Sequence, residues 1–110
     1  MMRAGVFFAA LLAASPCAAA ADSFGLDRVR LPAGMTMENC LERAKTAMTD
    51  AGLSVILVSE GAVGGRSPDI NKAMIICVPE SGIAMVSVNA PADAPFREAW
   101  QAMSDAMEAP

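Results

Sequence analysis

The hydrophobic positions of the chain follow a helical period in one stretch and a strand period in the next. Between Thr36 and Gly52, apolar residues recur every three or four positions, which predicts an amphipathic helix. Thr36 is a favourable N-cap, and Gly52 suits the left-handed position after a helix end. The apolar stripe of this helix comprises Met37, Cys40, Leu41, Ala44, Ala47, Met48 and Ala51.

Three short runs rich in β-branched residues follow and predict strands over 54–59, 73–78 and 83–88. Residues 79–82 read Pro-Glu-Ser-Gly, which is typical of a tight turn. The last two strands should therefore pair as an antiparallel hairpin. Residues 60–72 carry several glycines and a proline, and they are expected to form a long loop.

Two further elements complete the pattern. In the entry segment 22–34, Val29 and Leu31 alternate with arginines, which indicates a short edge strand. A last helix should begin near Asp93, with Pro95 in its first turn. Its apolar stripe comprises Phe96, Ala99, Trp100, Met103 and Met107.

Each predicted helix has one apolar stripe, so both should bury that stripe against the same sheet. The sequence therefore predicts an α+β fold, a two-layer sandwich with the order (β)αβββα. The sheet should have three or four mainly antiparallel strands, with two helices on one face.

The first 21 residues have the order of a secretory signal peptide: Arg3, an apolar run over 6–14, and small residues after Pro16. The chain then divides into a signal peptide (1–21), an extended entry segment (22–34) and one α+β domain (35–110). A lipidated Cys17 is the rival interpretation, but Pro16 stands where a small residue is wanted. We expect a periplasmic or secreted product without stable membrane insertion after cleavage.

Removing residues 1–21 leaves seven basic and twelve acidic residues, a net charge of −5. No basic stripe is visible along the sequence, which argues against nucleic acid and against anionic membrane surfaces as partners.

Cleavage also removes Cys17 and leaves Cys40 and Cys77. Two cysteines in a small exported domain usually form a structural disulfide. Two buried thiols or a redox pair remain as alternatives, although catalytic dithiols favour a Cys-x-x-Cys motif at a helix start.

Catalytic and metal-binding patterns are sparse. The chain has no histidine, and its carboxylates are scattered, so a small enzyme is only an alternative reading and no cofactor is expected. The run Met35-Thr36-Met37 and the pair Met103 and Met107 could offer thioether ligands to copper. The competing interpretation is that these methionines fill the core.

The glycine-rich stretch 61–67 lacks the pattern of a phosphate-binding loop. It is expected to be an exposed mobile loop, with a small anion or a partner contacting Arg66 and Lys72 as the alternative.

Strand alternation yields the most specific functional hypothesis. If Cys77 faces the helix, then Met74, Ile76 and Val78 face the other side of the sheet. That face is either an interaction surface, for a homodimer or a protein partner, or it is covered by residues 22–34. The leading function is thus a non-enzymatic binding module, and the alternative is a copper carrier or a small enzyme.

A resemblance accompanies these patterns. The run Met35–Leu41, then Ala44 and Ala51-Gly52, then Ile75–Val78, resembles small secreted bacterial proteins of uncharacterised function. They share a helix that opens with Cys-Leu and a strand that carries a second cysteine. The similarity covers about residues 30 to 105 and implies a signal peptide and a disulfide, but no activity.

Overall fold

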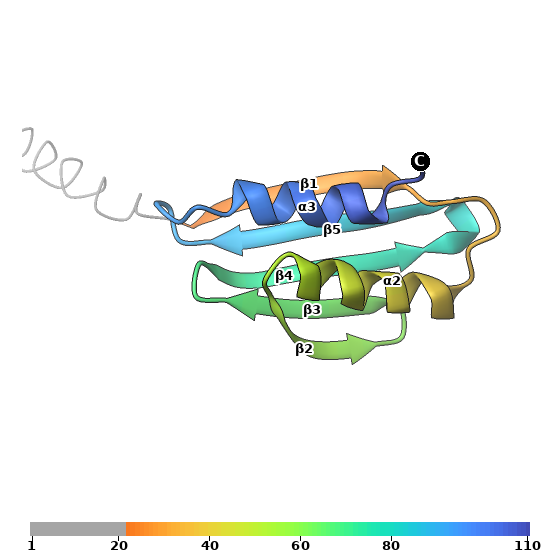
Figure 1. Ribbon diagram of the computed structural model, residues 1–110, viewed down its shortest axis with the longest axis horizontal. Helices are drawn as coiled ribbons and strands as arrows, with labels where there is room; N and C mark the ends of the chain where they lie inside the picture. Colours follow the sequence, from red (N-terminus) through yellow and green to blue (C-terminus); the bar gives the residue numbers. More distant parts are fainter. Residues whose placement is uncertain (1–21) are drawn as a thin grey trace, which may run out of the picture.

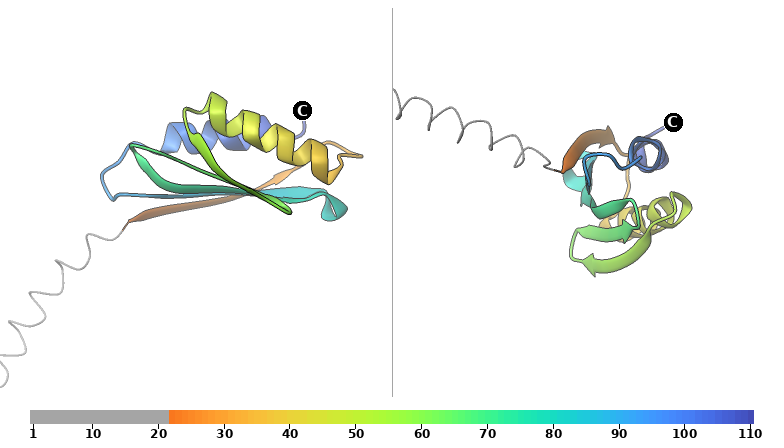
Figure 2. Two further views of the ribbon diagram at one scale, coloured as in Figure 1. Left: turned by 90° about the horizontal axis from the view of Figure 1, so that it is seen from below. Right: turned by 90° about the vertical axis from the view of Figure 1, so that its left-hand side faces the viewer.

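The computed structural model describes residues 22–110, which form two layers: a sheet and, on one of its faces, two helices (Figures 1 and 2). The elements in chain order are β1 (Ser23–Arg30), α2 (Met37–Asp50), β2 (Ser54–Ser59), β3 (Ala62–Ser67), β4 (Ile70–Val78), the 3₁₀ turn η2 (Pro79–Ser81), β5 (Ile83–Ala90) and α3 (Arg97–Met107). The predicted α+β class and the placement of both helices on one face are confirmed. The signal peptide predicted for residues 1–21 lies outside the described residues.

The sheet has five strands in the order β1-β5-β4-β3-β2, and every neighbouring pair is antiparallel. The expectation of three or four strands was therefore too low. The predicted hairpin is confirmed, with Val78 opposite Ile83 across η2. The entry segment contributes β1, an edge strand that pairs with β5 along its whole length.

The prediction of a long loop over 60–72 is wrong, because β3 occupies its centre. The reason lies in two adjacent glycines that face opposite sides of the sheet. A Cβ atom on Gly65 would lie 2.7 Å from the sulfur of Met48, and one on Gly64 would lie 3.0 Å from the sulfur of Met74. These glycines mark close side-chain approach within a strand, which sequence alone does not distinguish from a loop.

Helix α2 follows its sequence signals closely. The Thr36 hydroxyl accepts a hydrogen bond from the Asn39 N–H at 3.1 Å, and Gly52 has a φ of 90° just after the helix. The buried residues of α2 are Cys40, Ala44, Ala47 and Met48. The predicted cap and the centre of the predicted stripe are thus confirmed.

Helix α3 begins at Arg97, four residues later than Asp93, because residues 91–94 form a turn closed by the Ala94 N–H on the Pro91 carbonyl. Its Trp100 lies flat against β1, where a Cβ on Gly25 would be 3.0 Å from the indole ring. The indole N–H donates to the Val86 carbonyl at 3.2 Å. Trp100 therefore fixes α3 to β1 and β5 together.

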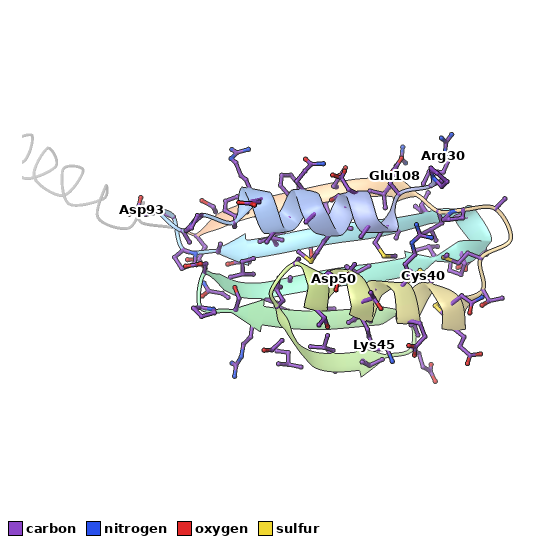
Figure 3. The ribbon with its side chains drawn as sticks, in the orientation of Figure 1. Arg30, Cys40, Lys45, Asp50, Asp93 and Glu108 are labelled. Carbon is purple, nitrogen blue, oxygen red and sulfur yellow. A yellow bond between two sulfur atoms is a disulfide. The ribbon has the colours of Figure 1, made fainter. Side chains whose placement is uncertain are left out.

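Arg43 joins the two helices. Its Nε donates to the Ala106 carbonyl at 2.7 Å and its Nη2 to the Glu108 carbonyl at 3.3 Å. A cation suits the C-terminus of α3, where carbonyl groups lack helical partners. The chain then runs beside the end of β1, where the Ala109 N–H donates to the Arg30 carbonyl at 2.7 Å; Figure 3 shows Glu108 next to Arg30.

The predicted disulfide between Cys40 and Cys77 is present and joins α2 to β4, with a Cα–Cα distance of 6.2 Å. Both cysteines are buried in the single core that lies between the layers. The bond therefore fixes the start of α2 against the end of β4, the central strand of the sheet.

We expect the Cys40–Cys77 bond to contribute strongly to stability, because it closes a loop of 37 residues. In the chain-entropy model this is worth about 4 kcal/mol. Cys40→Ala should lower the free energy of unfolding by about 2–5 kcal/mol in urea titrations. The wild type treated with reductant is the matched control and should unfold at a similar midpoint. An unchanged urea midpoint in both the variant and the reduced wild type would show that the bond does not contribute to stability.

Gly25→Ala should destabilise the domain, because the new methyl group would overlap the Trp100 ring. We expect a loss of about 1–3 kcal/mol, measured by urea unfolding and by the fluorescence of this lone tryptophan. In a Trp100→Leu background the same change should cost much less, because the smaller side chain leaves room. Equal costs in both backgrounds would mean that the glycine is needed for another reason.

Candidate functional site

The candidate site is the outer face of the sheet, which is the face that points away from both helices. No element of residues 22–110 lies over it (Figure 2). The strand register aligns its residues in rows that cross the sheet. One row consists of Leu26, Ser87, Met74, Gly64 and Leu57, and the next consists of Arg28, Met85, Ile76, Ala62 and Ser59.

The three predicted contact residues all lie on this face. Ile76 is 41% exposed, whereas Met74 and Val78 are half-buried by neighbouring outer-face residues. Residues 22–34 do not cover them, since β1 lies beside β5 in the sheet. The alternative in which residues 22–34 cover this face is therefore wrong.

Sequence reasoning missed much of the apolar surface that surrounds Ile76. Leu26 (51% exposed) and Phe24 (65% exposed) extend it on β1, and Leu57 (49% exposed) extends it on β2. Met85 lies directly opposite Ile76 on β5. The alternation within 83–88 could have located Met85, but the contributions of β1 and β2 depend on sheet order, which the sequence does not reveal.

The outer face also gathers basic residues. Arg28 and Arg30 alternate with the inward-facing Val29 on β1, and Lys72 alternates with Ala73 on β4. Arg66 follows the inward-facing Gly65 on β3. Four of the seven bases that follow residue 21 thus share one face. The sequence shows no basic stripe, because these bases are far apart along the chain and share a face only in the folded sheet.

Acidic residues are distributed differently. Asp27 is the lone acid within the five strands, and it faces the helices, opposite the buried Val86. The other acids lie on the helices, in the turns at strand ends, or in the segments flanking these elements; Asp50 and Glu108 illustrate this in Figure 3. No carboxylate therefore occupies an outward position of the strands.

The outer-face bases are also unpaired. Within residues 22–110 the ion pair that forms is between Lys45 and Glu42 on α2, at 2.6 Å. The side chains of Arg28, Arg30, Arg66 and Lys72 form no ion pair in this part of the chain, although the backbone N–H of Arg30 donates to the Glu108 carboxylate at 3.2 Å. Their charge is available to a bound molecule.

The methionines considered as copper ligands separate into two groups. Met103 and Met107 are fully buried in the core, as the competing interpretation requires. Met35 and Met37 lie around the start of α2, where Met37 is exposed. Residues 22–110 contain no cluster of three histidine, cysteine or carboxylate side chains suited to a metal ion.

The depressions of the surface are open rather than enclosed. One of about 840 Å³ lies between the start of α2 and β2, lined by Met37, Leu41 and Val58 with Glu38 and Glu60 at its rim. Among the described residues, Ser104 is the one polar side chain that is fully buried, and no charged side chain is. Within residues 22–110, all acidic and basic side chains thus remain at least partly exposed.

Comparisons with known proteins add no identity: no family model, no curated protein and no solved structure matches this chain. None of the helices in residues 22–110 has the length and apolar character needed to cross a bilayer.

Adjacent isoleucines on β4 provide a direct test of the two faces. Ile75 is fully buried beneath the helices, whereas Ile76 lies on the outer face. Ile76→Glu should stay folded, with a change in unfolding free energy within about 1 kcal/mol. Ile75→Glu buries an unpaired charge and should leave the domain unfolded. Circular dichroism and urea titration distinguish these outcomes, and equal damage from both changes would contradict an uncovered outer face.

Proposed function

We propose that this protein is an exported, non-enzymatic interaction module that binds a protein partner through the outer face of its sheet. The observation that carries the proposal is the uncovered apolar surface around Ile76. It includes Leu26, Met74 and Leu57, which share a row that crosses all five strands.

The physical support is the cost of leaving such a surface in water. Monomeric proteins rarely expose contiguous apolar patches beyond a few hundred Å², and larger patches usually mark interaction sites. Phe24, Leu26 and Leu57 would each gain from burial, at roughly 25 cal/mol for every Å² of apolar area removed from water. A bound partner would remove this cost while leaving the core between sheet and helices untouched.

Export is part of the proposal. The signal-peptide pattern of residues 1–21 and the resemblance to secreted bacterial proteins both favour it, and the Cys40–Cys77 bond suits an oxidising compartment. A periplasmic or extracellular site of action follows from these three features together. Intact-mass analysis of exported protein should give a chain that begins at Ala21 or Asp22.

The copper-carrier and enzyme alternatives receive no comparable support. The buried positions of Met103 and Met107 favour a packing role for these residues. An interaction module requires only the surface already described.

Site-specific photo-crosslinking in the native host tests the proposal. A photoreactive amino acid at Leu26, on the outer face, should give a crosslinked protein adduct, because the partner would cover this position. The same residue at Gln101, which is exposed on α3, is the matched control and should give none. Adding Ile76→Glu to the Leu26 probe should abolish the adduct.

Two results would contradict the proposal. One is the absence of adducts from Leu26 in cells where the protein is exported and folded. The other is equal crosslinking from Leu26 and Gln101, which would indicate random collisions instead of a specific surface.

A further inference from the structure

We infer that the partner is a segment of a different protein, in which carboxylates flank apolar side chains. This inference rests on the proposed function and adds the chemistry of the partner. It derives from the charge of the outer face, which is opposite in sign to that of the protein as a whole.

The charge separation is nearly complete. The chain after residue 21 carries a net charge of −5, yet the outward positions of the strands hold four bases and no acid. Arg28 lies at the β1 end of one row, and the other three bases lie beyond the two rows. Arg28 and Arg30 lie on edge strand β1, Arg66 lies beside edge strand β2, and Lys72 lies at the start of β4. An apolar centre with a charged rim is the usual anatomy of a protein interface.

The residue types point to protein as the partner. Interfaces are enriched in aromatic residues, methionine and arginine, and depleted in aspartate and glutamate. Phe24, Met74 and Met85 supply the first two classes, and three of the four bases are arginines. Arginine is suited to carboxylates, because its planar guanidinium can donate two parallel hydrogen bonds to one carboxylate.

A second copy of this chain does not provide the required complement. Two outer faces packed together would place four bases against four bases, with no carboxylate between them. The helix side of a second copy does carry an apolar depression, lined by Met37, Leu41 and Val58 beside Glu38 and Glu60. A contact between that depression and the outer face would join two different surfaces, so it would not close into a dimer and would leave one outer face uncovered. Among the described residues, the large apolar side chains that are exposed lie on β1, β2 and β4, with Met37 on α2 as the exception.

A flat anionic membrane fits less well than a protein segment. Glu60, Asp69 and Glu80 lie in the turns at both ends of the sheet. A membrane that contacts the whole outer face would also approach these carboxylates, and like charges repel. A narrow segment can cross the strands between the turns and meet only the apolar rows and the bases.

Selection from a random dodecapeptide library displayed on phage tests this inference. The target is the exported, disulfide-bonded chain beginning at Ala21 or Asp22, and peptides that also bind the Ile76→Glu variant are discarded. The enriched peptides should combine apolar residues with an excess of aspartate and glutamate over lysine and arginine. Enrichment of neutral or basic peptides, or of none that depend on Ile76, would overturn the inference.

Charge reversals on the outer face and on the helices then test which bases contribute to peptide binding. For an enriched peptide, Arg28→Glu/Lys72→Glu should weaken binding at least about tenfold in fluorescence anisotropy, because both changes fall on the outer face. Lys45→Glu/Arg97→Glu changes the net charge equally but lies on the helices, and should leave affinity within about twofold. Equal losses from both pairs would indicate a long-range effect of net charge, and the inference would fail.

Two further measurements distinguish this inference from the proposed function. A dimer in sedimentation equilibrium that Ile76→Glu dissociates, or outer-face-dependent binding to phosphatidylglycerol vesicles in place of peptides, would overturn the inferred partner. If crosslinking from Leu26 succeeds while the selection yields no acidic peptides, the interaction module stands and its inferred partner chemistry is wrong. If crosslinking from Leu26 fails, the proposed function is itself contradicted.

Discussion

The packing of both helices onto one face of the sheet is the constraint on which the rest of this structure depends. The Cys40–Cys77 bond holds α2 against β4, and Trp100 holds α3 against β1 and β5. Arg43 joins the two helices through carbonyl groups at the end of α3. With both helices committed to one side, no element in residues 22–110 remains to cover the other.

Helix α2, the β4–β5 hairpin and the disulfide could be predicted because the sequence patterns that indicate them are local. A cap residue, a stripe with helical period and a terminal glycine specified α2, and a four-residue turn specified the β4–β5 hairpin. The pairing of Cys40 with Cys77 also followed, since a stripe position and a strand position each point toward the core. The cap, the stripe and the turn each depend on residues only a few positions apart, and each cysteine was placed by the local pattern around it, although the bond spans 37 positions.

The remaining features depend on contacts between distant residues. Gly64 and Gly65 look like loop residues in the sequence, but they lie in β3, where the sulfur atoms of Met74 and Met48 leave little room for a side chain. Likewise, the bases at Arg28 and Lys72 are 44 positions apart in the sequence, yet β1 and β4 both flank β5 and turn these side chains to one face. The order of strands in the sheet decides both the contacts of these glycines and the shared face of these bases. No local sequence pattern predicts that order.

The two faces of the sheet thus serve separate purposes. The inner face holds the core, the disulfide and the glycine contacts that set stability, and each of these is sensitive to a change of one methyl group. The outer face contributes few of these contacts, so its residues can change charge or size without unfolding the domain. A domain of this size has only one core, and here one sheet face remains outside that core. The exposed leucines and arginines of the outer face are then a consequence of the architecture, and their shared position is the basis of the partner chemistry that we propose.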